Sequence, residues 1–206
     1  MRLKKRIGVD FDNTIIDYDR VFRTVAVAEC LVDRRIAGGK QEVRAAIREL
    51  PNGELVWQKL QGRVYGRWIG DAVMFDGVEA FLRQCRSAGH EVMIVSHKTE
   101  YGHFDPERVN LRDAARGWMH ERGFFEPEGL GVPADAVHFE TTRADKLARI
   151  GALGCTHFID DLPEVLDDPD FPPNVSKILF TNGATVEPRQ PHAYASWHEI
   201  ASALLS

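Results

Sequence analysis

Five short apolar runs, spread along the chain, limit the folds that this sequence can adopt. They are residues 6–11, 91–96, 136–139, 156–159 and 177–180. Each run is rich in Val, Ile or Phe and ends in polar residues, which is typical of strands buried on both faces. Helical patterns that end near a glycine lie between these runs, at residues 78–87, 109–122 and 143–150. The alternation predicts an α/β fold in which helices cover both faces of a parallel sheet.

Residues 17–74 interrupt this alternation, because they contain no strand candidate. Three helical patterns follow one another there, at residues 18–35, 40–50 and 54–69. We therefore expect an α/β core made of residues 1–16 and 75–206, with residues 17–74 inserted after the first strand as a small all-helical part. A loop at 181–191 and a short helix near 197–205 are expected to complete the core.

Composition and charge exclude several classes of protein. The 206 residues are 44% hydrophobic and 28% charged, which fits a globular chain and not a disordered tail. The net charge of −5 provides no general field for a polyanion such as duplex DNA, so we expect no nucleic-acid partner. The three cysteines lie far apart in the sequence, which favours a reducing compartment. Because neither a signal peptide nor a membrane-spanning stretch is recognisable, we expect a cytoplasmic protein with no membrane partner.

Acidic residues mark the ends of two predicted strands. Asp10 and Asp12 come at the end of the first strand, and Asp160 and Asp161 follow the fourth. Ligands of open α/β sheets bind outside the carboxyl ends of the strands, so a parallel sheet would bring both pairs to the same edge. Four carboxylates at one edge repel one another unless a cation lies among them. A donor set made only of oxygen favours a hard divalent ion, and magnesium above calcium if phosphate oxygens complete the shell.

Two further side chains are expected at this edge. Ser96 ends the second strand, where its hydroxyl can donate to a phosphate oxygen. Lys146 lies near the start of the helix after the third strand. An ammonium at that place can offset the acidic cluster and hold both an aspartate and a transferring phosphoryl group.

Taken together, these residues resemble the four motifs of the haloacid dehalogenase (HAD) superfamily, in the same order. They are Asp10, Asp12 and Thr14 in a DxDxT arrangement, then Ser96, Lys146 and the pair Asp160 and Asp161. The resemblance covers residues 1–16 and 75–206. It implies a HAD-like catalytic core with a Rossmann-like, five-stranded parallel sheet in the order 5-4-1-2-3. It also implies that residues 17–74, which lie between the first two motifs, form a helical cap.

The resemblance also implies roles for the acidic residues. Asp10 would be the nucleophile that attacks phosphorus and forms an aspartyl-phosphate. Asp12 would protonate the leaving oxygen and then activate water. Its presence points to phosphoryl transfer, because the dehalogenases of the superfamily lack this second aspartate. Mg²⁺ would be held by the Asp10 carboxylate, the Asp12 backbone carbonyl and Asp161, with Asp160 acting through a water molecule; which of the last two binds directly stays open.

The remaining candidates would orient or bind the substrate. Ser96 and Lys146 would orient the phosphoryl group, and Thr14 would support its loop by hydrogen bonding. A cap of this kind closes over the site and selects the leaving group. Substrate contacts are therefore expected from residues near the motifs, which are Thr14, Arg20, Arg23, His97 and Lys98.

These features predict a magnesium-dependent phosphatase that acts on a small soluble phosphate monoester, such as a sugar phosphate, a nucleotide or a biosynthetic intermediate. Two alternatives stay open. The same core could return the phosphoryl group to a second hydroxyl, as a phosphomutase or phosphotransferase does, or it could serve as a binding module without catalysis. The sequence leaves open whether the protein is a monomer or a homodimer.

Overall fold

The apolar runs form a six-stranded parallel sheet in the computed structural model, which describes residues 3–184 and 192–206. Along the sheet the strand order is β5-β4-β1-β6-β7-β8. The strands are β1 (Arg6–Val9), β4 (Glu91–His97), β5 (Val137–Glu140), β6 (His157–Asp160), β7 (Ser176–Phe180) and β8 (Ala193–Tyr194). The central strand β1 is flanked by β4 and β6, so its carboxyl end lies between theirs.

The sixth strand corrects the predicted count of five. The five predicted strands occur and keep their expected order relative to one another, while β8 extends the sheet beyond β7 through the pairs Leu179 with Ala193 and Phe180 with Tyr194. With only two residues, β8 carries no apolar run that a sequence pattern could reveal. The loop predicted at 181–191 lies partly outside the described residues, which omit 185–191.

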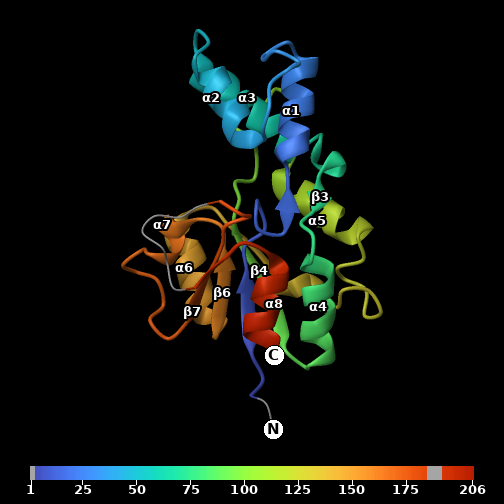
Figure 1. Cartoon of the computed structure of the whole chain (residues 1–206), viewed down its shortest axis with the longest axis vertical. Coiled ribbons are helices and arrows are strands. Elements are labelled where there is room, and N and C mark those ends of the chain that lie inside the picture. The colour runs from blue at the N-terminus through green and yellow to red at the C-terminus, as the bar shows by residue number, and fades with distance from the viewer. Residues whose placement is uncertain (1–2, 185–191) are drawn as a thin grey trace. The chain divides into compact units, whose positions relative to one another are not determined.

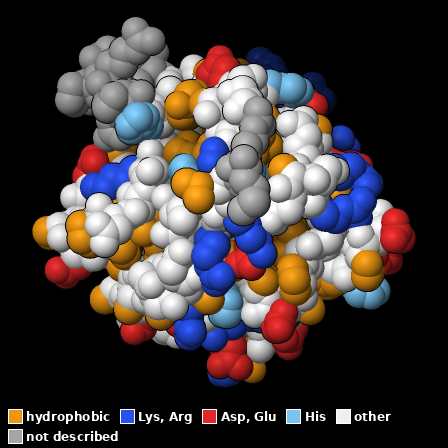
Figure 2. Space-filling model, turned by 90° about the horizontal axis from the view of Figure 1, so that it is seen from below, with side chains coloured by type: hydrophobic (Ala, Val, Ile, Leu, Met, Phe, Trp, Pro, Cys, Tyr) orange, Lys and Arg blue, Asp and Glu red, His pale blue; other side chains and the backbone are white. Residues whose placement is uncertain are grey.

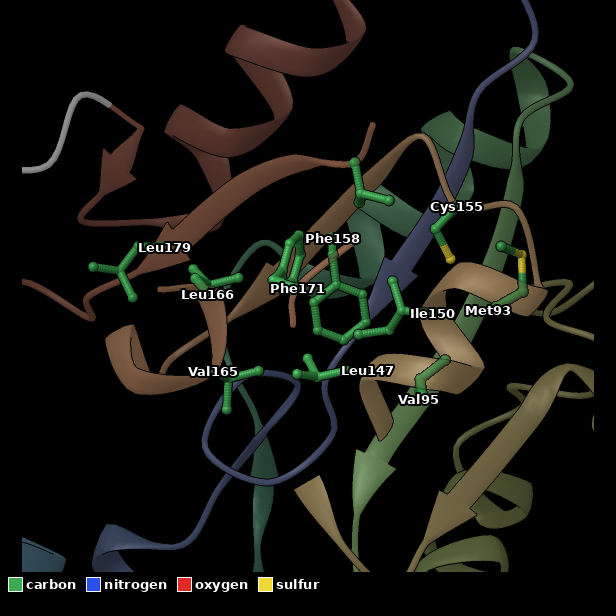
Figure 3. Close-up of a cluster of buried hydrophobic side chains, with 11 residues drawn as sticks. Met93, Val95, Leu147, Ile150, Cys155, Phe158, Val165, Leu166, Phe171 and Leu179 are labelled. Atoms are coloured by element: carbon green, nitrogen blue, oxygen red, sulfur yellow. The ribbon is translucent and has the colours of Figure 1, made fainter. Parts of the chain in front are cut away.

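Helices cover both faces of this sheet, as Figure 1 shows. On one face α4 and α8 pack against each other, with Phe81, Phe180 and Trp197 in ring contact. On the other face α6 and α7 cover a buried apolar cluster that includes Phe158 and Leu147 (Figure 3). The bounds are α4 (Val78–Ser87), α6 (Arg143–Ala152), α7 (Pro163–Leu166) and α8 (Trp197–Leu205), with a 3-10 helix at Ala134–Ala136.

The chain divides into two compact units, and each has its own interior. Unit 1 consists of Met1–Ile16, Met74–Lys98 and Arg122–Ser206, and it contains the six-stranded sheet. Unit 2 consists of Asp17–Val73 and Thr99–Glu121. The short strands β2 (Ile16–Asp17) and β3 (Val73–Met74) pair with each other where the chain passes between the units.

Unit 2 is helical and is built around aromatic side chains. Phe22 stacks on Trp57, and Tyr18 and Tyr65 meet each other edge to face. The helices are α1 (Asp19–Ala28), α2 (Lys40–Arg48), α3 (Gly53–Tyr65) and α5 (Leu111–Glu121), with a 3-10 helix at Ile69–Asp71. The helix predicted over 18–35 is shorter in the structure, because Cys30 adopts a left-handed backbone conformation with φ of 56° just after it.

The surface carries charges of both signs. On the face shown in Figure 2, basic and acidic side chains are interspersed. Surface ion pairs of the sheet's amino end include Lys4 with Glu91 at 2.7 Å and Arg6 with Glu91 at 2.6 Å. Exposed pairs of this kind contribute little to stability. No helix within residues 3–184 and 192–206 combines the length and apolar character needed to cross a membrane.

Candidate active site

Strand register brings the first pair of acidic residues together. Asp10 directly follows β1, and Asp160 is the last residue of β6. The two strands are neighbours, with Val9 opposite Ile159, and the backbone N–H of Asp10 continues the ladder by donating to the Ile159 carbonyl at 2.9 Å. Both carboxylates therefore lie at the carboxyl edge of the sheet, as expected from their positions in the sequence.

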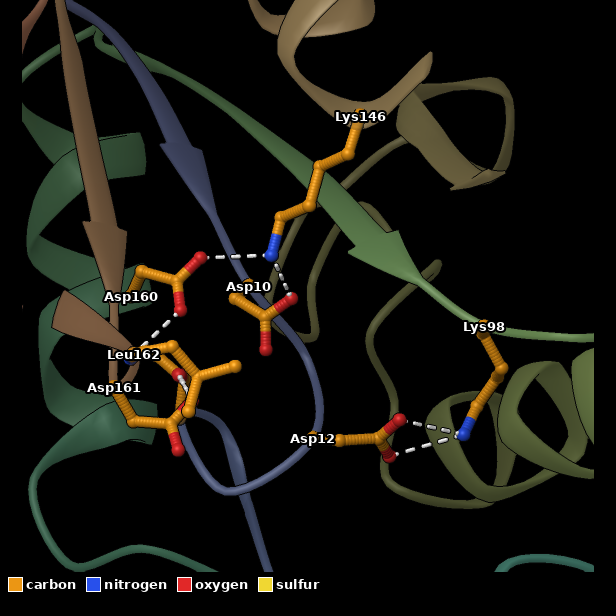
Figure 4. Close-up of polar contacts among 8 residues, drawn as sticks. Asp10, Asp12, Lys98, Lys146, Asp160, Asp161 and Leu162 are labelled. Carbon is orange, nitrogen blue, oxygen red and sulfur yellow. Dashed lines mark hydrogen bonds and ion pairs between the residues drawn. The ribbon is translucent and has the colours of Figure 1, made fainter. Parts of the chain in front are cut away.

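A buried lysine bridges these two carboxylates (Figure 4). Lys146 donates from Nζ to Asp10 Oδ1 at 2.6 Å and to Asp160 Oδ2 at 2.7 Å. Its side chain is only 2% exposed. Thr142 caps the first turn of α6 by accepting a hydrogen bond from the Asp145 backbone, which sets where Lys146 leaves the helix. The lysine predicted to offset the acidic cluster thus lies within it.

The third carboxylate of the cluster is Asp161. Thr14 Oγ1 donates to Asp161 Oδ1 at 3.1 Å, which ties the loop after β1 to the end of β6. Asp160 accepts a further hydrogen bond on Oδ1 from the Leu162 backbone at 2.9 Å. One carboxylate oxygen from each of Asp10, Asp160 and Asp161 lies within 4.8 Å of the others, so the three could hold a metal ion. An all-oxygen donor set of this kind fits Mg²⁺.

The charge balance of this cluster is uneven. Burial raises the pKa of Asp160 to about 6; the Lys146 ammonium opposes this shift and the Asp10 carboxylate adds to it. Burial alone would lower the pKa of Lys146, but the carboxylates of Asp10 and Asp160 outweigh burial and raise it. One ammonium therefore serves two carboxylates of a cluster of three, and a divalent cation would relieve their mutual repulsion.

The loop that carries Asp12 and Thr14 is fixed by backbone contacts. Asn13 adopts a left-handed conformation with φ of 60°, which this residue type tolerates, and the chain turns back so that the Phe11 carbonyl accepts hydrogen bonds from the two isoleucines that follow Thr14. Trp197 of α8 donates its indole N–H to the Thr14 carbonyl at 3.0 Å. The loop is thereby held from the opposite end of the sequence.

A second lysine holds Asp12. Lys98 donates from Nζ to both carboxylate oxygens of Asp12, at 3.0 and 2.8 Å (Figure 4). The Lys98 side chain is 2% exposed and that of Asp12 is 17% exposed. The sequence suggested Lys98 as a contact to phosphate or substrate, but it gave no sign of this partner, which is 86 residues away.

The other candidates occupy different surroundings. Ser96 is buried near the end of β4, opposite Phe139 of β5. His97 is exposed, and its Nε2 lies 2.8 Å from the carbonyl oxygen of Thr141. Arg20 and Arg23 belong to unit 2, where both are exposed on α1. Unit 1 therefore brings together Asp10, Asp12, Thr14, Lys98, Lys146, Asp160 and Asp161, each through a hydrogen bond to another member.

Comparison with known proteins identifies the fold. No protein-family model and no curated protein matches the sequence. Solved structures are nevertheless similar over almost the whole chain. A HAD-superfamily hydrolase from Ehrlichia chaffeensis has 12% identity and a TM-score of 0.51, with 98% of this chain and 97% of that chain covered. A predicted phosphoglycolate phosphatase from Haemophilus somnus has 14% identity and a TM-score of 0.55, with coverage of 98% and 99%.

A protein that is not described as a hydrolase shares this architecture. Protein tyrosine kinase A (PtkA) from Mycobacterium tuberculosis has 15% identity and a TM-score of 0.61, with 98% of each chain covered. Several further hydrolases described as haloacid dehalogenase-like align at similar scores. At identities this low, the structural similarity establishes the fold and leaves the reaction open. The chain has the fold of these haloacid dehalogenase-like hydrolases.

Proposed function

We propose that this protein is a magnesium-dependent phosphatase that hydrolyses a small soluble phosphate monoester through an aspartyl-phosphate intermediate. The observation that carries the proposal is the convergence of three carboxylates, those of Asp10, Asp160 and Asp161, two of which, Asp10 and Asp160, share the buried ammonium of Lys146. Asp12 lies near this cluster, in the loop that follows β1 and Asp10 (Figure 4). The HAD-fold hydrolases to which the chain is similar support a hydrolytic reaction.

In the first step a carboxylate oxygen of Asp10 attacks phosphorus. The new O–P bond forms as the bond from phosphorus to the ester oxygen breaks, and Asp12 donates a proton to that leaving oxygen. Lys146 holds Oδ1 of Asp10, and the other oxygen of this carboxylate points away from the lysine (Figure 4). Lys146 thereby fixes the orientation of the nucleophile.

In the second step Asp12 removes a proton from a water molecule, whose oxygen attacks the phosphorus of the aspartyl-phosphate. The O–P bond to Asp10 breaks, inorganic phosphate leaves and the Asp10 carboxylate is restored. Bound Mg²⁺, held by Asp10, Asp161 and the Asp12 carbonyl, with Asp160 behind a water molecule, would supply the positive charge that the phosphoryl oxygens require. Ser96 and Lys146 orient the phosphoryl group.

Residues 17–74, which supply most of unit 2, are the proposed cap. Their sequence position, between the first two motifs, is that of an element which closes over the substrate and selects the leaving group. Arg20 and Arg23 on α1 are proposed to contact an anionic substrate, and His97 is proposed to contact the substrate from unit 1. The substrate classes that fit are a sugar phosphate, a nucleotide or a phosphorylated biosynthetic intermediate.

Phosphate release from a panel of esters tests this proposal. The panel contains sugar phosphates, nucleotides and an aryl phosphate, assayed with Mg²⁺ and with a chelator. We expect release that needs Mg²⁺ and that falls by about 1,000-fold or more in Asp10→Asn, because the nucleophile is lost. Asp135→Asn is the matched control, since Asp135 is exposed in the 3-10 helix before β5.

Two results would overturn the proposal that this protein is a phosphatase. One is the absence of phosphate release from every ester by folded wild-type protein that binds Mg²⁺. The other is release that Asp10→Asn leaves unchanged. Transfer of the phosphoryl group to an added alcohol or to a second hydroxyl of the substrate, without free phosphate, would instead establish a phosphotransferase on the same residues.

A further inference from the structure

We propose that Lys98 is a positioning residue that fixes the Asp12 carboxyl group, which in its protonated form donates to the leaving oxygen and then regains a proton from the attacking water. The inference rests on the proposed function and adds a residue to it. Lys98 contacts both carboxylate oxygens of Asp12, at 3.0 and 2.8 Å. Two hydrogen bonds from one ammonium to one carboxylate restrict its rotation, whereas a single bond would leave it free to turn.

Lys98 is itself held in place. Its backbone N–H donates to the Glu140 carbonyl at 2.9 Å, which anchors the residue just beyond the pairing of β4 with β5. The ammonium lies over the ring of Phe11, 5.6 Å from the ring centre. With 2% of the side chain exposed, Lys98 has little freedom to adopt another rotamer. The ammonium is therefore a fixed point against which Asp12 is oriented.

Exposure distinguishes the two members of the pair. The Lys98 side chain is 2% exposed and its ammonium is directed at Asp12, whereas Asp12 keeps 17% of its side chain exposed. Asp12 is therefore the member of the pair that a leaving oxygen can reach. The role of Lys98 differs from that of Lys146, which contacts Asp10 and Asp160.

The dependence of rate on the leaving group tests this role. Wild type and Lys98→Met are compared by kcat/KM on a series of phosphate monoesters, from alkyl phosphates to 2,4-dinitrophenyl phosphate. A poor leaving group needs the proton from Asp12, and a very acidic one does not. We expect Lys98→Met to slow alkyl phosphates by about 100-fold and the dinitrophenyl ester by less than about 5-fold. Lys98→Arg should recover most of the alkyl activity, because guanidinium can also bind both carboxylate oxygens.

A double-mutant cycle asks whether Lys98 acts through Asp12. On phenyl phosphate, Lys98→Met should lower the kcat/KM of the wild type by about 10-fold but change that of Asp12→Asn by less than about 2-fold. Lys177→Met is the matched control, because this exposed lysine of β7 stacks on Phe171 away from the site. It should leave the whole series unchanged.

The outcomes separate the two proposals. An equal loss on every ester, or a full additional loss in Asp12→Asn, would overturn the positioning role and assign Lys98 to direct substrate binding. No activity of the wild type on any ester would overturn the proposed function itself. Thermal unfolding checks that each variant folds. If Lys98→Met does not fold, Lys98→Gln replaces it, since its neutral amide keeps N–H donors without the charge and is expected to show an intermediate dependence on the leaving group.

Discussion

Two lysines hold carboxylates near the end of β1, and their surroundings differ. Lys146 lies between Asp10 and Asp160, so one ammonium serves two carboxylates, and Asp161 adds a third carboxylate to the cluster. Lys98 holds both oxygens of a single carboxylate, that of Asp12. The first cluster has more carboxylates than ammonium groups, an excess of negative charge that a cation can balance, whereas the second pairs one ammonium with one carboxylate. In the proposed reaction, the metal ion and the transferred proton thus have separate places at one sheet edge.

Replacement of each lysine should give the largest difference between the two clusters, in the free energy of unfolding. Lys146→Met leaves two buried carboxylates facing each other, and we expect the free energy of unfolding to fall by about 3–5 kcal/mol. Lys98→Met leaves one partly exposed carboxylate, and we expect a loss of about 1–3 kcal/mol. Urea denaturation in the presence of a chelator measures both. The surface variant Lys177→Met should cost less than about 1 kcal/mol, and equal losses from Lys98→Met and Lys146→Met would contradict the distinction.

The stability gained on Mg²⁺ binding should also distinguish the two clusters, with a smaller effect. At a Mg²⁺ concentration of about 100 times its dissociation constant, we expect the wild type to gain about 2.7 kcal/mol of stability. Asp161→Asn should remove most of this gain, because it deletes a proposed ligand. Asp12→Asn should keep it, because the proposed ligand at that position is the backbone carbonyl. Thermal unfolding with and without Mg²⁺ gives the result, and a loss of the gain in Asp12→Asn as large as in Asp161→Asn would place the metal elsewhere.

The pH dependence of stability gives the smallest effect. The pKa of Asp160 is raised from 3.8 to about 6 in the folded protein, so its contribution to stability is fully present below the unfolded pKa and is lost as pH rises through the folded one. In the presence of a chelator, the free energy of unfolding of Asp160→Asn should therefore rise by about 1–2 kcal/mol relative to that of the wild type between about pH 4 and pH 7. Denaturation at several pH values measures the difference.

A control for the pH experiment comes from the metal. Saturating Mg²⁺ stabilises the ionised carboxylates of the cluster, so the difference in slope between wild type and Asp160→Asn should shrink. The opposite result would be that, in the presence of a chelator, Asp160→Asn loses stability relative to wild type as pH rises. It would mean that Lys146 lowers the pKa of Asp160 more than burial raises it.

The fold was largely predictable because the strands of a sheet covered on both faces are apolar along their length. Ile7 and Val9 of β1 are both fully buried, although they alternate with Gly8, whose missing side chain admits the ring of Phe158. The short edge strand β8 was not predictable, because two residues have no periodicity. The early end of α1 was missed because Cys30 is not a residue type that marks a left-handed turn.

The candidate site was predictable where position along a strand decides the outcome. Asp10 and Asp160 meet because adjacent parallel strands end together, and this follows from the pattern of the sequence. The partner of Lys98 was not predictable, because a lysine just after a strand suits a phosphate contact as well as an ion pair. Only the packed structure shows that its ammonium is covered and faces Asp12.

The hydrogen bond from Trp197 to Thr14 spans 183 residues and has a consequence for the order of assembly. A ribosome releases the loop after β1 early and α8 last among the described elements. Until α8 docks, the Thr14 carbonyl lacks its indole donor, and the segment that carries Asp10 and Asp12 lacks that support. Nascent chains should therefore form most of the parallel sheet before the candidate site is fully ordered, so that the ordering of this site is a late step of folding.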